Sequence, residues 1–441
     1  MSSERTNKLT QLDFAHVWHP FTQHSEWFRN EPLFIDRAEG CVLEDTEGRQ
    51  YIDAVGSLWV GVHGHRHPIV DAAVQKQLEH VAHSTFLGLS HPPAVELAEQ
   101  LVQCTPEGLQ RVFFSDSGST SVEIALKMAF QAQQQRGETR RIRFAALREA
   151  YHGDTVGSVS VGGIDLFHKV YRPLLFEAAH LPCPDHYNKE RFLADQAIQI
   201  LEEQGDELAA LIVEPLVQGA AGMRMHSPEF LEPVVKRARE LGALIIFDEV
   251  ATGFGRTGSF FATDQLRTKP DFLCLGKGLT NGYLPLAVTM TTEEVFSSFL
   301  GSHEHTFFHG HTYTANPLGC AAALATLRVF QQEKTMEKVE LLVEKMAQML
   351  RPLASRQDVG LVRQKGLMVG IDLRGRSGEA LPQKARTGHR ICMAARQHGV
   401  ILRPLGDTVV MMPPLCITER QLHKVVEVFA HVLDQHKVVA E

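Results

Sequence analysis

Two largely apolar runs end in opposite charges in the second half of the chain, and this pairing constrains the fold more than any other feature. The first run, residues 243–250, reaches Asp248, and the second, residues 271–275, is followed by Lys277 between two glycines. A continuous apolar run is typical of a parallel strand buried on both faces. Ligands of open α/β sheets lie beyond the carboxyl ends of the strands. The sequence therefore predicts that an acid and an amine meet at one edge of a sheet.

An acid and a lysine in this arrangement suit pyridoxal phosphate (PLP). Lys277 would form a Schiff base with the cofactor and, once displaced, would move protons as a base. Asp248 would keep the pyridine nitrogen protonated, which the electron-withdrawing chemistry of the ring requires. In the simpler interpretation Asp248 caps a helix and Lys277 is a solvated loop residue. Their occurrence together on successive apolar runs favours the cofactor site.

Two further segments fit such a site. Residues 116–120 lie between a predicted strand and a helix, and a helix N-terminus binds phosphate through its unpaired N–H groups. Gly118 would let the backbone approach the phosphate and Ser119 would add a hydroxyl donor, although serine is also a common helix cap. Tyr151 follows another predicted strand and would lie on the face of the ring; a tyrosine of the core is the alternative.

The composition is that of an ordinary globular protein. The net charge of −8 and the lack of a basic block argue against nucleic acid as a partner. Seven scattered cysteines without a CxxC pair predict a reducing, cytoplasmic location without disulfides or a zinc ribbon. The first ten residues lack the apolar core of a secretory signal, and no apolar run approaches the ~20 residues of a membrane span. We therefore expect no membrane partner.

Histidines recur in two places, which raises the question of a metal. His63, His65 and His67 alternate, and four more histidines lie between residues 303 and 311. No carboxylate or cysteine joins them at ligand spacing, and PLP chemistry needs no metal. We expect no metal site, and assign the first group to a loop near the active site and the second to a dimer contact.

Alternating strands and helices predict an α/β fold with a mainly parallel central sheet covered by helices. Large-domain strands are expected at residues 111–115, 141–147, 208–215, 243–250, 271–275 and 285–291. Residues 1–12 look like a flexible start, residues 33–60 like a small antiparallel sheet, and residues 318–354 like one long helix. The sequence after residue 355 predicts a smaller α+β domain, with strands near 368–373, 400–403 and 408–412.

The predicted domains are an N-terminal segment (1–70) that packs with the small domain, a large PLP-binding domain (71–334) and a small C-terminal domain (335–441).

The motifs of the chain, taken in order, resemble those of the class III aminotransferases, which have the type I fold of PLP-dependent enzymes. The matching segments are Tyr51-Ile52-Asp53, His63-Gly64-His65, Ser117-Gly118-Ser119, Tyr151-His152-Gly153-Asp154-Thr155, Val213-Glu214-Pro215, Asp248-Glu249-Val250, Gly253-Phe254-Gly255-Arg256, Gly276-Lys277-Gly278, His309-Gly310-His311-Thr312 and Asn316-Pro317. Within the class, residues 18–22, 403–406 and 412–414 are similar to the branch that aminates 8-amino-7-oxononanoate to 7,8-diaminononanoate in biotin synthesis.

The resemblance implies a role for each matching cofactor residue. Lys277 would carry the cofactor, and Asp248 would pair with the pyridine nitrogen. Gly118 and Ser119 would hold the phosphate. The remaining implied cofactor contacts are Tyr151, over the ring, and His311 and Thr312, which would reach the phosphate of the neighbouring subunit's cofactor. The resemblance therefore implies a homodimer with shared active sites.

The resemblance also implies a set of substrate contacts, which are Phe21, Leu58, Trp59, Tyr151, Lys277, Gly310 and Arg403. Arg403 would bind the carboxylate of the oxononanoate chain, because a planar guanidinium holds a carboxylate through two hydrogen bonds. An ordinary surface arginine is the alternative to this role.

The presumed donor pocket departs from the branch that uses S-adenosylmethionine. Leu58 replaces the first of two tryptophans, and Phe21 replaces a tyrosine, while Leu405 and Val410 replace an aromatic residue and a tyrosine. Aromatic faces hold a sulfonium cation well, so their loss disfavours S-adenosylmethionine. The same pattern is similar to that of a subgroup with lysine as its donor. S-adenosylmethionine and lysine both remain as donors. Ala220 stands where relatives that use 2-oxoglutarate carry a glutamate, which disfavours that couple.

Three other functions compete with this interpretation. Another class III ω-aminotransferase, which acts on ω-amino acids or diamines with pyruvate, is the nearest. A mutase would return the amino group to the same carbon skeleton. A catalytically idle regulator would add a basic DNA-binding domain, which the sequence lacks, and would not need both Lys277 and Asp248.

Overall fold

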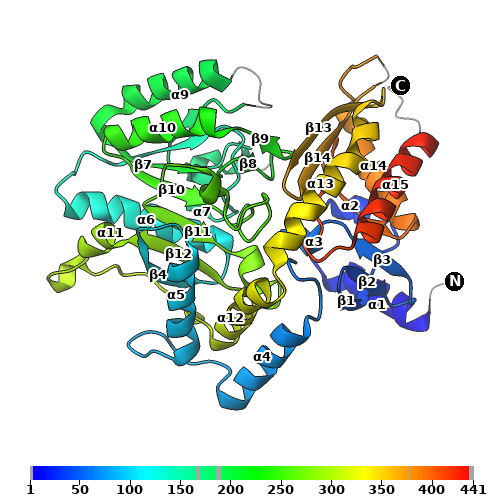
Figure 1. Cartoon of the computed structure of the whole chain (residues 1–441), viewed down its shortest axis with the longest axis horizontal. Helices are drawn as coiled ribbons and strands as arrows, with labels where there is room; N and C mark the ends of the chain where they lie inside the picture. The colour runs from blue at the N-terminus through cyan, green and yellow to red at the C-terminus, as the bar shows by residue number, and fades with distance from the viewer. Residues whose placement is uncertain (1–2, 165–168, 185–189, 376, 437–441) are drawn as a thin grey trace.

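The computed structural model describes residues 3–164, 169–184, 190–375 and 377–436. Figure 1 shows a larger body built around a central sheet, beside a smaller body that contains both ends of the chain. The strands near the N-terminus, β1 (Ile35–Glu39), β2 (Val42–Asp45) and β3 (Gln50–Asp53), lie in the smaller body together with the last helix, α15 (Glu419–Gln435). The chain therefore begins and ends in the same part of the molecule.

The central sheet has seven strands within the described residues. Their order is β4 (Leu109–Ser115), β12 (Ala287–Thr292), β11 (Phe272–Leu275), β10 (Leu244–Asp248), β7 (Leu208–Val213), β5 (Arg143–Leu147) and β6 (Ala178–Leu181). The neighbours from β11 to β6 run parallel, whereas β12 is antiparallel to both of its neighbours. The prediction of a mainly parallel sheet is confirmed.

Helices cover both faces of this sheet, and this explains the continuous apolar runs. Every residue of β7 and of β10 is buried, as expected of strands without a solvent-facing side. One face packs against α6 (Gly118–Gln135). The helices that pack with the other face are α5 (Pro92–Cys104), α9 (Glu190–Gln204), α10 (Pro228–Glu240) and α12 (Pro317–Gln332). The remaining elements of the larger body are α4 (Pro68–His80), α7 (Val156–Ser160), α11 (Glu293–Ser297), β8 (Val217–Gln218) and β9 (Arg224–Met225).

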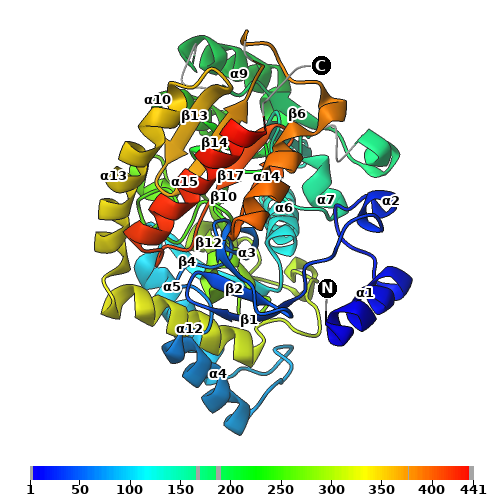
Figure 2. The same ribbon diagram turned by 90° about the vertical axis from the view of Figure 1, so that its right-hand side faces the viewer.

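In the part of the chain that the structure describes, two four-stranded sheets form the smaller body. In the first, β3 pairs in parallel with β15 (Val400–Ile401), and Ile52 lies opposite Val400. The second sheet has the order β13 (Val359–Lys365), β14 (Met368–Leu373), β17 (Thr408–Met411) and β16 (Arg403–Leu405). Figure 2 shows α13 (Thr335–Ala354), α14 (Thr387–Gln397) and α15 together on this body. The β3–β15 pairing supports the predicted grouping of the N-terminal segment with the small domain, whose boundaries stay predictions.

Two predictions about helices were wrong. The start of the chain is not a flexible segment, because α1 (Glu4–His16) begins after Ser3, whose side chain accepts a hydrogen bond from Thr6 N. Residues 318–354 do not form one helix: α12 ends at Gln332, and Lys334 has a left-handed backbone with φ of +51° before α13 begins. Residues 331–335 contain neither glycine nor proline, so the usual residues of a helix end are missing at this break.

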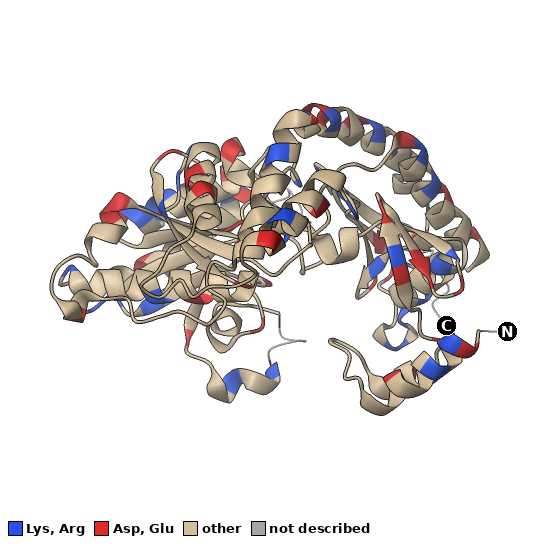
Figure 3. Ribbon diagram, turned by 90° about the horizontal axis from the view of Figure 1, so that it is seen from below, with Lys and Arg blue, Asp and Glu red and all other residues tan. Residues whose placement is uncertain are grey.

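The surface of the described residues mixes both charges. Lys and Arg are interspersed with Asp and Glu over the elements seen in Figure 3. The same view shows that α1 lies in an arm at the edge of the molecule. Among the described residues, no helix combines the length and apolar character that crossing a membrane requires.

Candidate active site

The carboxyl ends of β10 and β11 bring an acid and an amine to one cavity. Asp248 is the last residue of β10, and Lys277 follows β11 after Gly276. The two strands are parallel neighbours, in which Asp248 lies opposite Cys274. Asp248 and Lys277 both line a cavity of about 370 Å³. The two groups therefore lie where the sequence predicts them, at one edge of the central sheet.

The environment of Lys277 favours its neutral form. Burial lowers the pKa of its amine, while the nearby carboxylates of Asp248 and Glu214 oppose this change. Its Nζ lies 5.5 Å from the ring centroid of Trp59. A lysine with a lowered pKa loses its proton more readily and can act as a nucleophile and as a base.

A buried histidine holds the acid. His152 Nδ1 lies 2.7 Å from Asp248 Oδ2, and the backbone N–H of Val250 donates to Oδ1 (3.0 Å). No sequence pattern assigned a role to His152, which lies within the Tyr151–Thr155 motif. Its position directly after Tyr151, on a loop at the carboxyl edge of the sheet, was the signal that could have suggested one.

A second buried acid fixes the loops that line the cavity. Glu214 follows β7, and its Oε1 accepts from Tyr151 N (3.1 Å) while its Oε2 accepts from Gly219 N (3.0 Å). Burial raises the pKa of Glu214 to about 7. Glu214 thus connects the loop that carries Tyr151 to the loop after β8. The hydroxyl of Tyr151 donates to Asp154 Oδ2 (2.8 Å).

Gly118 and Ser119 form the first turn of α6 and line the same cavity. A Cβ at Gly118 would lie 2.4 Å from Val250 Cγ1, so only glycine fits there. The Ser119 hydroxyl lies 2.8 Å from Thr155 Oγ1 and accepts from Thr155 N (3.0 Å). Hydroxyl groups beside the positive end of a long helix form an environment that suits a phosphate group.

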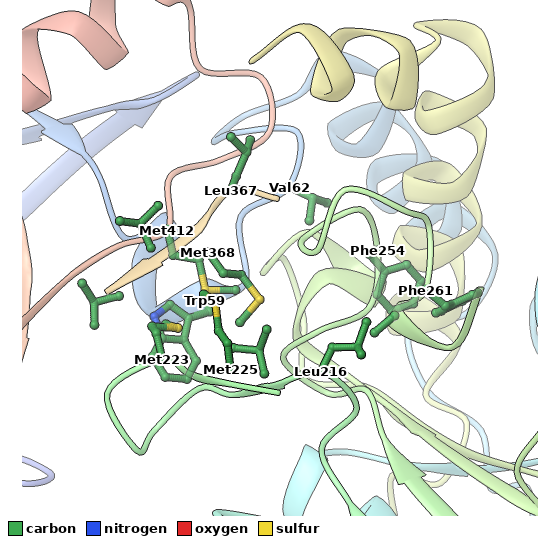
Figure 4. Packing of buried hydrophobic residues seen from close by; sticks show 14 of the residues in the cluster. Trp59, Val62, Leu216, Met223, Met225, Phe254, Phe261, Leu367, Met368 and Met412 are labelled. Atoms are coloured by element: carbon green, nitrogen blue, oxygen red, sulfur yellow. The ribbon is translucent and has the colours of Figure 1, made fainter. Parts of the chain in front are cut away.

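Trp59 reaches the cavity from a turn in the smaller body. Gly56, Ser57, Leu58 and Trp59 have φ angles of +52°, +46°, +66° and +72°. A left-handed conformation costs an L-residue about 1–2 kcal/mol, so this turn is strained. Trp59 is buried and lines the cavity, whereas Leu58 is half exposed. Figure 4 shows the indole of Trp59 among methionine side chains, which include Met223, Met225, Met368 and Met412.

The groups present match the chemistry of PLP. A carboxylate suits a protonated pyridine nitrogen, a lysine of lowered pKa suits an aldehyde, and helix N–H groups with a hydroxyl suit a phosphate. All of them line one cavity, which the glycine at position 118 keeps open. The described residues contain no group of three or more His, Cys, Asp or Glu side chains that could hold a metal ion.

Comparison with known proteins identifies the family. The family model "Aminotransferase class-III" matches residues 24–433. The chain belongs to the class III aminotransferases. This class is the one that the sequence motifs resemble, and the type I fold that they imply is also confirmed.

Curated relatives share nearly the whole length of this class III aminotransferase. A protein of Nitratidesulfovibrio vulgaris named adenosylmethionine-8-amino-7-oxononanoate aminotransferase is 49% identical over 440 residues, which cover 96% of this chain and 81% of that protein. A protein of the same name from Aquifex aeolicus is 47% identical and is covered over 95% of both chains.

The solved structures that are similar to this chain are also those of aminotransferases. The crystal structure of the protein of that name from Methanocaldococcus jannaschii is 40% identical, with a TM-score of 0.94 and coverage of 97% of this chain and 99% of that one. A PLP-bound amine transaminase from an uncultivated Pseudomonas species is 35% identical, with a TM-score of 0.90 and coverage of 95% and 98%.

Other predicted site residues of this aminotransferase do not line the cavity. Arg403 lies on β16, partly buried, and close enough to Tyr151 for their charges to interact; its Nε has no hydrogen-bond partner within the described residues. Phe21 is exposed on the N-terminal arm. Gly310 and Thr312 are exposed in the loop before α12. These assignments stay predictions.

Two residues of the presumed donor pocket, Leu405 and Val410, lie on β16 and β17. Val410 lies opposite Arg403 in the β16–β17 pair, as expected of a neighbour of that arginine. Its side chain is fully buried in the core, however, whereas Leu405 is partly buried. Val410 therefore does not line the cavity. His311 Nε2 lies 3.8 Å from Asp116 Oδ1, beside the first turn of α6.

Two of the histidines that raised the question of a metal have ordinary partners. His63 is buried, and its Nε2 lies 3.0 Å from the carbonyl oxygen of Thr326. His65 pairs with the buried Asp53 at 3.1 Å. His63 and His65 thus fix the loop that follows the left-handed turn.

Proposed function

We propose that this protein is a PLP-dependent aminotransferase that converts 8-amino-7-oxononanoate to 7,8-diaminononanoate on the route to biotin. One observation carries the proposal: Lys277, Asp248 and Ser119 line one cavity in a chain that is 40% to 49% identical to relatives named for this reaction. A further argument is that these relatives match nearly the whole chain, so the substrate-binding parts are included.

Each of the cavity residues would have a separate role in amino transfer. When bound, PLP supplies an aldehyde that takes up amino groups and a protonated ring that withdraws electrons. Lys277 would hold the cofactor and then use its free Nζ to accept and return a proton at the substrate carbon. Asp248, oriented by His152, would keep the proton on the ring nitrogen. The N–H groups and hydroxyl at Gly118 and Ser119 would bind the phosphate.

Arg403 would recognise the acid end of the oxononanoate chain. Its Nε lacks a hydrogen-bond partner among the described residues, and a guanidinium can donate two parallel hydrogen bonds to a carboxylate. Tyr151 and Trp59 would bound the space between this arginine and Lys277, with Leu58 on the same turn. The aliphatic chain of the substrate matches the largely apolar character of these side chains.

The amino donor is S-adenosylmethionine or lysine. The relatives carry the former in their names, whereas the aliphatic Leu58 and the non-hydroxylated Phe21 favour the latter. A half-reaction separates them, because the true donor converts the yellow enzyme to its pyridoxamine form without any acceptor present. Only the true donor should bleach the visible absorbance of the cofactor at low concentration, and S-methyl compounds without an amino group serve as controls.

An acceptor assay tests the proposed function against its nearest alternative. With the donor fixed, 8-amino-7-oxononanoate should be aminated far faster than pyruvate or 2-oxoglutarate. A preference for pyruvate would instead support an ω-aminotransferase of the kind that several structural neighbours represent at 29% to 35% identity. Failure of all acceptors with an enzyme that binds PLP would reject both functions.

We also propose a homodimer with shared active sites in the cytoplasm. Leu87, Phe308 and Tyr313 expose 90%, 68% and 58% of their surface, and the ring of Tyr313 lies 5.0 Å from that of His83. The Tyr313–His83 contact joins the loop that carries Leu87 to the loop that carries Phe308, and exposed apolar patches mark interfaces. Trp18 on the N-terminal arm is 90% exposed. The seven cysteines are free thiols, which supports a reducing compartment.

A further inference from the structure

Two cysteines from opposite ends of the chain are in contact in the smaller body. The Sγ atom of Cys41 lies 3.5 Å from the Sγ atom of Cys416. Cys41 lies between β1 and β2, and Cys416 lies in the segment between β17 and α15. Both side chains are free thiols. The sulfur atoms of a disulfide are about 2.0 Å apart, so a short approach of the two thiols would allow a covalent bond.

Backbone hydrogen bonds hold the segments that carry the two thiols. The backbone N–H of Asp53 donates to the carbonyl oxygen of Cys41 (2.8 Å). The backbone N–H of Leu415, the residue before Cys416, donates to the carbonyl oxygen of Val62 (2.9 Å). Rotation about a Cα–Cβ bond moves a cysteine sulfur without breaking such bonds. The contact is therefore fixed by the fold, while the sulfur atoms themselves can still move.

A glycine leaves the space that the thiol of Cys416 occupies. A Cβ at Gly64 would lie 2.8 Å from Cys416 Sγ and 2.6 Å from the carbonyl oxygen of Gly40. Gly40 precedes Cys41 and pairs with His65, the residue after Gly64. Any side chain at position 64 would therefore displace the sulfur of Cys416 from its place beside Cys41.

The two thiols differ in their access to solvent. All seven cysteines lie in the part of the chain that the structure describes, and Cys416 is the only exposed one among them. Cys41 is buried, with only 3% of its surface exposed. A small oxidant in solution therefore meets the sulfur of Cys416 first, and Cys41 lies directly behind it.

The contact also favours one proton arrangement. A hydrogen bond from Cys41 lowers the pKa of Cys416, and the nearby positive charge of Arg256 acts in the same direction. The same contact, together with burial, raises the pKa of Cys41. The thiolate is the reactive form of cysteine. The exposed sulfur is therefore the nucleophile of the pair, and the buried one stays protonated beside it.

We propose that Cys416 is a peroxide-reactive thiol and that Cys41 is its resolving partner, so that the two close to a reversible disulfide. The Cys416 thiolate attacks a hydroperoxide, the O–O bond breaks, and Cys416 becomes a sulfenic acid while the remaining oxygen leaves, protonated, as an alcohol or water. The sulfur of Cys41 then attacks that of Cys416. The S–S bond forms, and the hydroxyl group leaves with the proton of Cys41 as water.

The two thiols thus supply the two electrons that reduce the peroxide. Closure also protects Cys416, because a sulfenic acid that finds no second thiol is oxidised further to a sulfinic acid, which ordinary thiols do not reduce. This chemistry is independent of the aminotransferase reaction and of the identity of its substrates.

Peptide mapping of the wild-type holoenzyme tests the proposal. The reduced protein is treated with a small excess of hydrogen peroxide, the remaining thiols are blocked with N-ethylmaleimide, and trypsin is added without reductant. Cleavage after Lys and Arg, but not before Pro404, places Cys41 in residues 38–49 and Cys416 in residues 397–420, each without another cysteine. We expect these two peptides to appear joined, at a mass about 2 Da below their sum, and to separate after treatment with dithiothreitol.

Two variants separate the roles of the thiols. In Cys41→Ser, oxidation of Cys416 should stop at the sulfenic acid, which dimedone labels, and excess peroxide should carry it on to the sulfinic acid that dithiothreitol does not reverse. Cys104→Ser is the matched control, since it removes a half-buried thiol at the end of α5. This control should form the bridge between Cys41 and Cys416 as the wild type does.

Three results would overturn the proposal. The first is that peroxide leaves residues 38–49 and 397–420 of the wild type unlinked. The second is that it joins residues 397–420 of two separate chains instead. The third is that Cys416 reaches the sulfinic acid as fast in the wild type as in Cys41→Ser. The wild-type digest requires no substitution, so it decides the matter even if Cys41→Ser does not fold.

Discussion

His152 Nδ1 lies 2.7 Å from Asp248 Oδ2, and both side chains are buried. With Val250 N bound to the other carboxylate oxygen, the acid is held from two sides. Its orientation is therefore set by the protein before any cofactor enters. Preorganised groups of this kind stabilise charge without reorganising during the reaction.

Replacing His152 by leucine should lower kcat without abolishing activity. A hydrogen bond to a charged group contributes about 1.5–3 kcal/mol, so kcat should fall roughly 10- to 100-fold. Asp248→Asn should cost about 100- to 1000-fold, the range for removing a group that stabilises developing charge. Steady-state kinetics and PLP titration measure both effects. His423→Leu, at an exposed position on α15, should change neither, and equal effects of all three would contradict the assignment.

Lys277→Ala should abolish turnover while leaving the fold intact. The amine that holds the cofactor and moves the proton is lost, so the visible absorbance of the bound cofactor should disappear with the activity. Circular dichroism and thermal melting report the fold. Residual turnover at the wild-type level would exclude Lys277 as the catalytic amine.

Mixing two inactive variants tests the shared site. We expect Lys277→Ala and the double variant His311→Ala/Thr312→Ala each to lose activity. After unfolding and refolding together, random pairing should restore about a quarter of the wild-type activity, because half of the dimers contain one intact site. Recovery is measured against each variant refolded alone. If His311 and Thr312 served the site of their own chain, the mixture would stay inactive.

Arg403→Lys should affect one substrate and not the other. Loss of the bidentate hydrogen bonds to the carboxylate should raise KM for 8-amino-7-oxononanoate at least about tenfold. KM for the donor should stay within about threefold of the wild-type value. Initial rates with each substrate varied in turn measure the split. A parallel rise for both substrates would indicate that Arg403 supports the pocket without binding the carboxylate.

Glu249 should make the folded state less stable as pH rises. Burial raises the pKa of its carboxyl from 4.5 to about 7, so the folded state favours the protonated form. Its contribution is fully present below about pH 4.5 and is lost as pH rises through 7, by at most about 3 kcal/mol. Glu249→Gln should flatten this dependence, although it also disturbs the hydrogen bonds to Ala262 and Thr263.

Denaturant unfolding between about pH 5 and pH 8 measures this effect. Glu340→Gln, on an exposed face of α13, is the control and should leave the slope of stability against pH unchanged. Identical slopes for the wild type and Glu249→Gln would show that Glu249 stays ionised in the folded state.

The sequence predicted the central sheet well because burial on both faces leaves a strong signal. The runs that end at Asp248 and before Lys277 are unbroken and apolar, so their strands and their shared edge followed directly. The break at Lys334 was less clear, because residues 331–335 contain neither glycine nor proline, the residues that most often mark a helix end.

Sequence patterns did not reveal the contacts between segments that are far apart in the chain. His152 meets Asp248 across almost 100 residues, and Arg256 meets Pro413 across more than 150. Such pairs depend on how segments distant in the chain pack against each other, which local propensity does not encode. The left-handed turn at Ser57 to Trp59 was also hidden, because these residue types avoid that conformation when tertiary contacts are absent.

The pairing of Ile52 with Val400 has a consequence for biosynthesis. About 350 residues separate the partners, which at roughly 5–20 residues per second takes a ribosome about 20 to 70 seconds to add. Throughout that interval the edge of β3 has no partner in its own chain. The nascent protein must therefore carry an open strand edge until its last tenth emerges, and this is the period in which a chaperone would matter most.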